Sequence, residues 1–169
     1  MLLTTLIILG SCDSITTNFE TNLTTTILAD VQLPEDVKST LKDFNTYPFH
    51  ASQTLDIKDN STINDYIDRL KEINVKSITA TFTGIPPGEK ITELNVSIQS
   101  VALDLNLENL ENGVVVELDV SHQLLNSISN ELTDNHGITI DISGASTYAP
   151  MTLSTLMDFQ VAVTARVLD

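Results

Sequence analysis

Residues 19–33 read FETNLTTTILADVQL, and apolar and polar side chains alternate along this stretch. The apolar residues share one parity: Phe19, Leu23, Ile27, Ala29, Val31 and Leu33. The opposite parity is mostly polar or charged: Glu20, Asn22, Thr24, Thr26, Asp30 and Gln32. A period of two is typical of a strand with one buried face and one wet face. The stretch therefore predicts a long β-strand that ends at Pro34, because proline cannot donate to a strand ladder.

The same alternation recurs along the rest of the chain. It is found in residues 49–57, 78–82, 94–98, 101–107, 114–120, 138–142 and 157–167. The parity of the apolar residues changes near Ser100, which predicts a bulge or a bend. About eight strands with threonine-rich wet faces and short turns favour a mainly β fold, an antiparallel β-sandwich. A β-barrel-like closure is the alternative, since either arrangement would bury the apolar faces.

Two segments have apolar residues at helical spacing instead. The first spans residues 62–73 and carries Ile63, Tyr66, Ile67, Leu70 and Ile73, with Thr62 and Asp65 approximating a capping box. The second follows Ser121 as a cap, carries Leu124, Leu125, Ile128 and Leu132, and is broken at residues 135–137. We therefore expect two short amphipathic helices that cover an open end or edge of the sandwich. Residues 143–150 are expected to form a turn.

The composition limits the partners of this domain. The 169 residues include 8 Lys and Arg against 23 Asp and Glu, which gives a formal charge of −15. Such an acidic chain is a poor nucleic-acid binder, because phosphate contacts need clustered Lys and Arg. After Lys90 there are 11 acids and one base, Arg166, so this part alone carries −10. The asymmetry points to cations or a basic partner near the later strands.

The first twelve residues, MLLTTLIILGSC, carry no charge. Their apolar run is too short to span a bilayer, which takes about 20 residues, but it suits the apolar core of a secretory signal. Residues 9–12, Leu-Gly-Ser-Cys, resemble a bacterial lipobox, although no Lys or Arg precedes the apolar run. The resemblance implies a signal peptide at 1–11 and a lipidated tether at 12–18, and the alternating pattern predicts a single β-sandwich domain at 19–169. Lipid on Cys12 would anchor the domain; the alternative is a buried N-terminal strand with a free thiol.

A broader resemblance rests on three features: the lipobox, the acidic threonine-rich β-domain, and residues 52–84, SQTLDIKDNSTINDYIDRLKEINVKSITATFTG. Together they resemble uncharacterised lipoproteins of Bacteroidota. This resemblance implies an extracytoplasmic protein that is lipid-anchored to the outer membrane, on its periplasmic or its surface face. It implies no reaction.

Residues that could carry chemistry are sparse. The three histidines, His50, His122 and His136, are far apart, and the HExxH and GxSxG motifs are missing from the sequence. Paired carboxylates could serve glycoside hydrolysis. However, most acids, such as Glu117 and Asp119, alternate with apolar residues, as on a solvated face. We therefore predict that the protein is not an enzyme.

One acidic cluster is a calcium candidate. Asp104, Asn106, Glu108 and Glu111 crowd one strand end and turn, and oxygen ligands suit Ca²⁺. The spacing departs from an EF-hand, because Val115 holds the twelfth position counted from Asp104. A solvated acidic hairpin explains the same residues without a metal. No other cofactor is predicted.

These observations favour a lipid-anchored cell-envelope β-domain with a non-enzymatic binding or structural role. Its partners would be the membrane, through lipid on Cys12, and an envelope protein. One alternative is a small carrier of lipid or another hydrophobic ligand, which would need an apolar cavity of roughly 300–1,000 Å³. Another is a hydrolase that uses paired carboxylates. The sequence does not specify the partner or the ligand.

Overall fold

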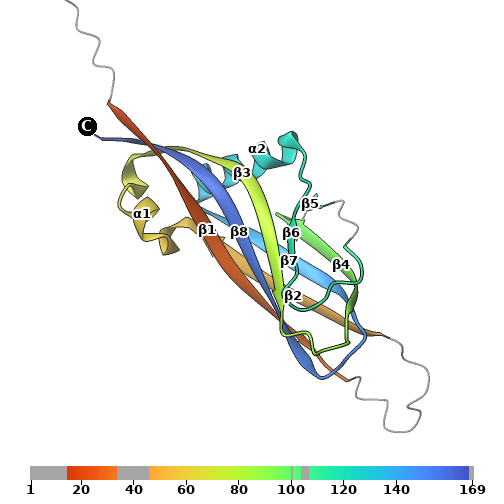
Figure 1. Cartoon of the computed structure of the whole chain (residues 1–169). Helices are drawn as coiled ribbons and strands as arrows, with labels where there is room; N and C mark the ends of the chain where they lie inside the picture. The colour runs from red at the N-terminus through yellow and green to blue at the C-terminus, as the bar shows by residue number, and fades with distance from the viewer. Residues whose placement is uncertain (1–14, 34–45, 100, 104–106, 168–169) are drawn as a thin grey trace, which may run out of the picture.

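The computed structural model describes residues 15–33, 46–99, 101–103 and 107–167. Eight strands and two α-helices, with two single turns of 3-10 helix (η), make up this part of the chain (Figure 1). In chain order they are β1 (Thr16–Val31), β2 (Tyr47–Asp56), η1 (Ile57–Asp59), α1 (Ser61–Asn64), η2 (Ile67–Arg69), β3 (Leu70–Thr83), β4 (Ile91–Ile98), β5 (Val101–Ala102), β6 (Val115–Glu117), α2 (His122–Asn135), β7 (Gly137–Ser146) and β8 (Met151–Arg166).

The strands form two four-stranded sheets. One has the order β1-β8-β3-β6 and the other the order β2-β7-β4-β5, and all paired neighbours are antiparallel. In the described residues the two sheets remain separate, so the predicted β-sandwich with two helices is confirmed over the barrel-like alternative. Both ends of the described chain lie at one end of the elongated molecule, opposite the turn between β7 and β8 (Figure 1).

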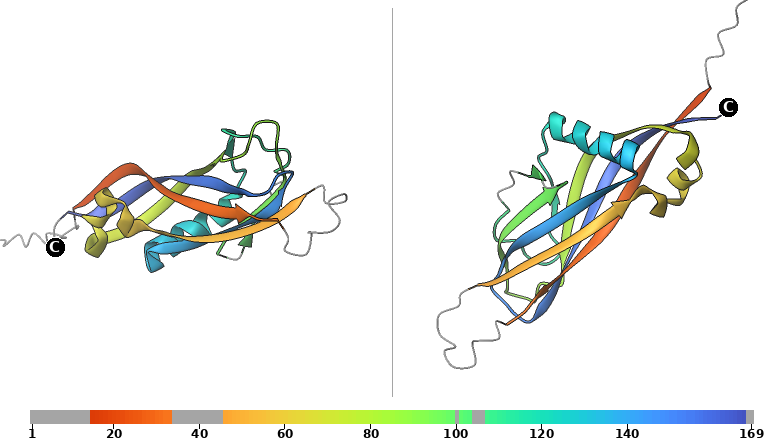
Figure 2. Two further views of the ribbon diagram at one scale, coloured as in Figure 1. Left: turned by 90° about the horizontal axis from the view of Figure 1, so that it is seen from below. Right: turned by 180° about the vertical axis from the view of Figure 1, so that it is seen from behind.

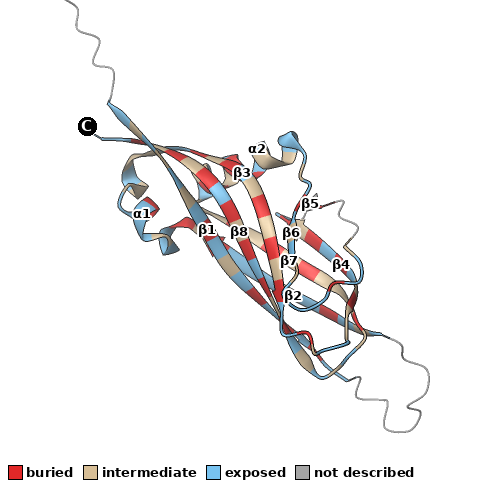
Figure 3. Cartoon of the chain, viewed as in Figure 1, coloured by how far each residue is buried: buried red, intermediate tan, exposed pale blue. Residues whose placement is uncertain are grey.

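The core lies between the sheets, and it confirms the parity predicted for residues 19–33. Leu23, Ile27, Ala29 and Val31 of β1 are buried, whereas residues of the other parity are exposed. The same banding of buried and more exposed residues runs along β3 and β8 (Figure 3). Side chains from both sheets, together with residues from the helices and loops, form one continuous apolar cluster. The hydrophobic effect of this shared core therefore holds the layers together.

β1 and β8 form the longest ladder in the molecule. Thr16 pairs with Arg166 at one end and Val31 pairs with Met151 at the other, without a register shift. β8 begins six residues before the predicted stretch 157–167, because Leu153 and Thr155 also face the core. The first and last strands of the described residues are thus neighbours in one sheet.

The chain between β4 and β6 covers one edge of the sandwich. Ile98 pairs with Val101 and Gln99 has a positive φ of 51°, so the predicted parity change is a tight reversal rather than a bulge. Bridges from Leu107 and Leu110 to β4 continue along the same edge. The chain then crosses to the other sheet, where β6 pairs with β3.

The predicted helix over residues 62–73 is wrong beyond its first turn. α1 ends at Asn64, and its cap is Asn60 rather than Thr62: the Asn60 side-chain oxygen accepts from the backbone N–H of Ile63 at 3.0 Å. Of the later apolar residues, Tyr66 caps the 3-10 turn η2 and Ile67 lies in it, whereas Leu70 and Ile73 belong to β3, where Ile73 pairs with Val163 of β8. Long-range strand pairing therefore overrides the local helical spacing.

The second helix, α2, is confirmed. Ser121 caps it by accepting from the backbone N–H of Leu124, and His136 ends it in the left-handed conformation with a φ of 61°. The helix packs against β3 and β7 (Figure 2). β7 extends to Ser146, so the turn predicted for residues 143–150 is shorter than expected.

Candidate functional site

Two hydroxyl groups of α2 complete the edge of β3. The Ser129 hydroxyl accepts from the backbone N–H of Val75 at 2.9 Å, and the Thr133 hydroxyl accepts from that of Ile73 at 2.9 Å. Four residues of helix rise about 6.0 Å and two residues of strand about 6.6 Å, so the two spacings match. The helix thus takes over hydrogen bonds that a further strand would otherwise supply.

Between this helix contact and β6, β3 carries a bulge. Val75 pairs with Val161 and Ser77 pairs with Gln160, so Lys76 is the extra residue. A bulge bends its strand and re-aims its side chain. The Lys76 side chain is exposed, at the point where the edge of β3 passes from α2 to β6.

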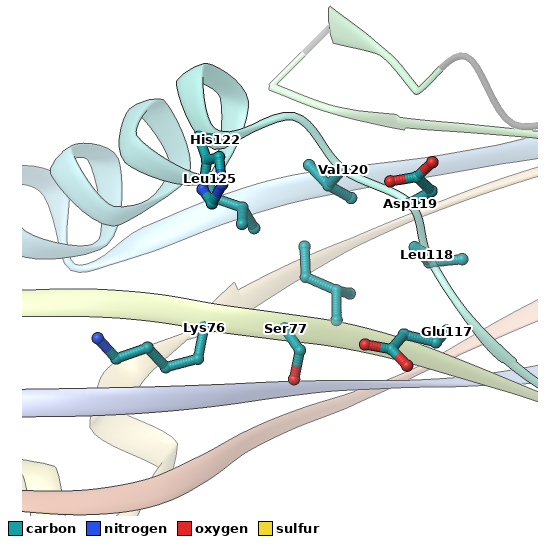
Figure 4. A pocket seen from close by; sticks show the side chains of 9 residues that line it. Lys76, Ser77, Glu117, Leu118, Asp119, Val120, His122 and Leu125 are labelled. Atoms are coloured by element: carbon teal, nitrogen blue, oxygen red, sulfur yellow. The ribbon is translucent and has the colours of Figure 1, made fainter.

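A surface groove of about 490 Å³ opens at this bulge (Figure 4). Its lining comes from β3, from β6 and the residues after it, and from the first turn of α2. The apolar lining residues are Ile78, Leu118, Val120 and Leu125, of which Ile78 and Leu118 are buried. The polar lining residues are Lys76, Ser77, Glu117, Asp119 and His122. The groove therefore combines apolar and charged side chains, as small binding sites commonly do.

The polar residues of the groove do not form a nucleophile–base pair. The Ser77 hydroxyl donates to the side-chain oxygen of Gln160 at 3.3 Å, on the outer face of the sheet. Glu117 and Asp119 are exposed, as predicted for acids on a solvated face. These two carboxylates therefore have the surroundings of surface acids.

The three histidines lie on separate elements. His50 is exposed on β2, and His122 is exposed at the start of α2. His136 is half-buried at the end of α2, where its backbone carbonyl accepts from the N–H of Ile57 at 3.0 Å. The three histidines are therefore not brought together into one site.

The other predicted site residues fall partly outside the described ranges. Cys12 lies outside them, so its lipidation stays a prediction. Of the calcium candidate, Asp104 and Asn106 also lie outside, while Glu108 and Glu111 are described and exposed. Among the described residues no group of three or more His, Cys, Asp or Glu side chains is placed to hold a metal. Calcium binding stays a prediction.

A second surface feature lies on the outer face of the sheet β1-β8-β3-β6. The register places Thr26, Leu156, Thr81 and Val115 in one row across the four strands, and Leu28 lies two residues beyond Thr26 on β1. The exposed fractions are 63% for Leu28, 40% for Leu156 and 63% for Val115. We call these three apolar residues, with the two threonines between them, the outer patch. Large apolar side chains that face water together are candidates for a contact surface.

Acidic side chains flank the outer patch. Asp158 and Glu117 lie in the next row of the sheet, where each is level with Thr79. The Asp158 carboxylate accepts from the side-chain amide of Asn22 at 2.8 and 3.0 Å. On the other side, Asp30 accepts from the Thr152 hydroxyl at 2.8 Å. These hydrogen bonds fix two of the three carboxylates beside the patch.

Basic residues of the same sheet lie elsewhere. Its four strands, all described, contain three: Lys71, Lys76 and Arg166. Arg166 is level with Thr16 at the end of the sheet where the described chain begins, and both lysines are in the half of β3 nearer that end. The outer patch is therefore apolar at its centre and acidic at its rim.

Neither the outer patch nor the role of the α2 hydroxyl groups is predicted by the sequence pattern. The patch needs the register of three strand pairs, because its residues are far apart in the sequence. The hydroxyls had one usable signal: Ser129 and Thr133 are four residues apart beside the buried Ile128 and Leu132. Polar residues at that spacing on a buried helix face require partners.

No described helix has both the length and the apolar character needed to cross a membrane. No protein-family model and no curated protein matches the sequence. Among solved structures, the chain is similar to the decameric BFDV capsid protein, with 10% identity, a TM-score of 0.45 and coverage of 87% of this chain and 99% of that one. It is also similar to a desmodium yellow mottle tymovirus structure, with 14% identity, a TM-score of 0.43 and coverage of 100% and 93%. At these TM-scores neither likeness bears on function.

Proposed function

We propose that the protein is a lipid-anchored, non-enzymatic domain of the bacterial cell envelope that binds a partner protein on its surface. The observation that carries the proposal is the distribution of apolar side chains. The space between the sheets is occupied by fully buried residues such as Phe82 and Phe159. The outer patch, by contrast, presents large apolar side chains to water. A filled interior with an apolar patch outside is the arrangement expected of a binding module.

The anchor part of the proposal rests on the lipobox and on the position of the chain ends. β1 begins four residues after Cys12, so lipid on that thiol would hold the Ile15 end of the sandwich near the bilayer. Between the two ends of the molecule, β1 runs for 16 residues, or about 50 Å at about 3.3 Å per residue. The anchored domain would therefore reach well beyond the lipid head groups.

Mass spectrometry of the native protein tests the anchor. We expect a mature chain that starts at Cys12 and carries lipid, and we expect Cys12→Ser to release the protein from the membrane fraction. An unmodified N-terminus at Met1 with a free Cys12 thiol would contradict the anchor.

Mild crosslinking of the anchored protein in intact cells tests the binding role. We expect one partner to be recovered in a constant ratio to this chain. Recovery of the chain alone at native abundance would contradict a binding role. Native mass spectrometry of the same material distinguishes the carrier alternative, because a carrier would retain a small hydrophobic ligand.

A further inference from the structure

The outer patch suggests which face of the domain binds and what that face binds. We propose that the outer patch is the docking surface for a partner protein whose contact surface is apolar at its centre and carries Lys or Arg at its rim. This inference rests on the proposed binding function and adds the face and the chemistry of the partner.

The apolar centre consists of outward-facing side chains that are exposed to water. Most other outward-facing positions on the same strands are polar. Along β1 the outward positions near the chain ends are polar, as at Asn18 and Asn22, whereas Leu28 is apolar. The same holds on β8, where Thr164 and Gln160 are polar and Leu156 is apolar. Apart from the small Ala162, the apolar outward residues of the four strands therefore gather in one half of the sheet.

The acidic rim selects the partner. Asp30, Glu117 and Asp158 surround the patch, and the basic residues of the sheet lie toward the other end. A partner with Lys or Arg at matching positions would gain complementary charge and faster association. A second copy of this chain would bring the same carboxylates face to face, which opposes self-association. Anionic lipid head groups would be repelled for the same reason.

The outer patch and its acidic rim are already ordered in the unbound domain. Asn22 and Thr152 hold the carboxylates of Asp158 and Asp30 in place by hydrogen bonds. The patch lies where β1, β8 and β3 pair without a register shift, so its backbone is already regular before a partner binds. A rigid surface loses little conformational entropy on binding.

Site-specific photocrosslinking in intact cells tests the inference with the full-length anchored protein. A photoreactive amino acid would replace Leu156 in the patch, Asn74 on the same outer face nearer the chain ends, or Asp119 in the groove beside α2. We expect a discrete protein adduct from position 156 and none from position 74. Mapping of the adduct should place the crosslink in a partner segment flanked by Lys or Arg.

Charge reversal supplies the second arm of the experiment. The double variant Asp30→Lys and Glu117→Lys should lower the adduct yield from position 156 by about tenfold, because like charges across an interface cost affinity. The control variant Glu20→Lys and Glu72→Lys makes the same change of charge on the same face, nearer the chain ends, and should leave the yield within about twofold. Circular dichroism of each variant would verify that it folds.

The outcomes separate the two proposals. An adduct from position 119 but not from position 156 would overturn the outer patch as the docking surface and leave the binding function standing. Adducts at position 156 with a second copy of this chain, or with lipid only, would also overturn the inference. If none of the three positions gives a protein adduct, the inference fails, and the binding function itself fails only if crosslinking of the unmodified anchored protein also recovers the chain alone.

Discussion

The backbone N–H of Val75 on β3 donates to the side-chain hydroxyl of Ser129 on α2, at 2.9 Å. The same hydroxyl donates to the carbonyl of Leu125 at 2.7 Å, so it satisfies one group of the strand and one of the helix. Thr133 repeats this arrangement one turn later, between Ile73 and the carbonyl of Ser129. The helix is therefore joined to the sheet edge by specific hydrogen bonds as well as by its apolar face.

Removal of the Ser129 hydroxyl should destabilise the domain. Ser129→Ala leaves the buried N–H of Val75 without its partner, and an unsatisfied buried donor costs about 1–3 kcal/mol. We expect the free energy of unfolding, measured by urea titration, to fall by about that amount. Ser127→Ala is the matched control on the exposed side of α2 and should change it by less than about 0.5 kcal/mol. Equal stability of the two variants would show that the Ser129 hydroxyl is dispensable.

Gly144 should be intolerant of any side chain. It lies on β7 between β2 and β4, and a Cβ there would overlap the backbone oxygen of Glu93 and approach the Phe49 ring to 2.8 Å. Because a backbone atom cannot move aside easily, we expect Gly144→Ala to lower the free energy of unfolding by about 2–4 kcal/mol. Ser143→Ala on the same strand serves as the control. A thermal melt of Gly144→Ala that matches the wild type would contradict this close approach.

The side chain of Asn112 should stabilise the β3–β4 loop. Its side-chain oxygen accepts from the backbone N–H groups of Gly84 at 2.9 Å and Ile85 at 3.2 Å. We expect Asn112→Ala to cost about 1 kcal/mol in chemical denaturation, and hydrogen exchange at both amides to speed up. Asn112→Asp keeps an acceptor oxygen, so its stability and the exchange rates of both amides should stay near those of the wild type. If Asn112→Asp is as unstable as Asn112→Ala, the two hydrogen bonds do not account for the lost stability.

Ionic strength should stabilise the folded protein. A formal charge of −15 repels itself more in the compact state than in the unfolded chain, and salt screens that repulsion. We expect the melting temperature to rise by several degrees between roughly 10 mM and 0.15 M NaCl. The variant Glu108→Lys and Glu111→Lys changes the charge by four, to −11, and should show a smaller rise. A melting temperature that falls with salt would point to favourable ion pairs instead.

Most of the strands could be predicted from the sequence because their apolar residues recur at every second position. In β1 the inward residues Leu23, Ile27, Ala29 and Val31 are those that the alternation selects. α2 could be predicted for a similar reason, since Ser121 marks its start and Ile128 and Leu132 its buried face. Where local pattern and tertiary burial agree, the sequence alone suffices.

Residues 62–73 show where that agreement ends. Ile63, Leu70 and Ile73 have helical spacing, but only Ile63 lies in a helix, while Leu70 and Ile73 pair with β8. The sequence contains no local sign of that pairing, because the partner strand lies about 90 residues later. The outer patch was beyond prediction for the same physical reason: Leu28, Val115 and Leu156 become neighbours only once the strand order is known.

The ladder between β1 and β8 also sets when the sheet can form. β1 is synthesised before the other described strands, whereas its neighbour β8 is synthesised after them. Thr16 therefore has no pairing partner until Arg166 has been synthesised. β3 depends on β8 as well, so the sheet lacks its central member until synthesis has passed the final strand. This sheet therefore cannot be completed before β8 has left the ribosome.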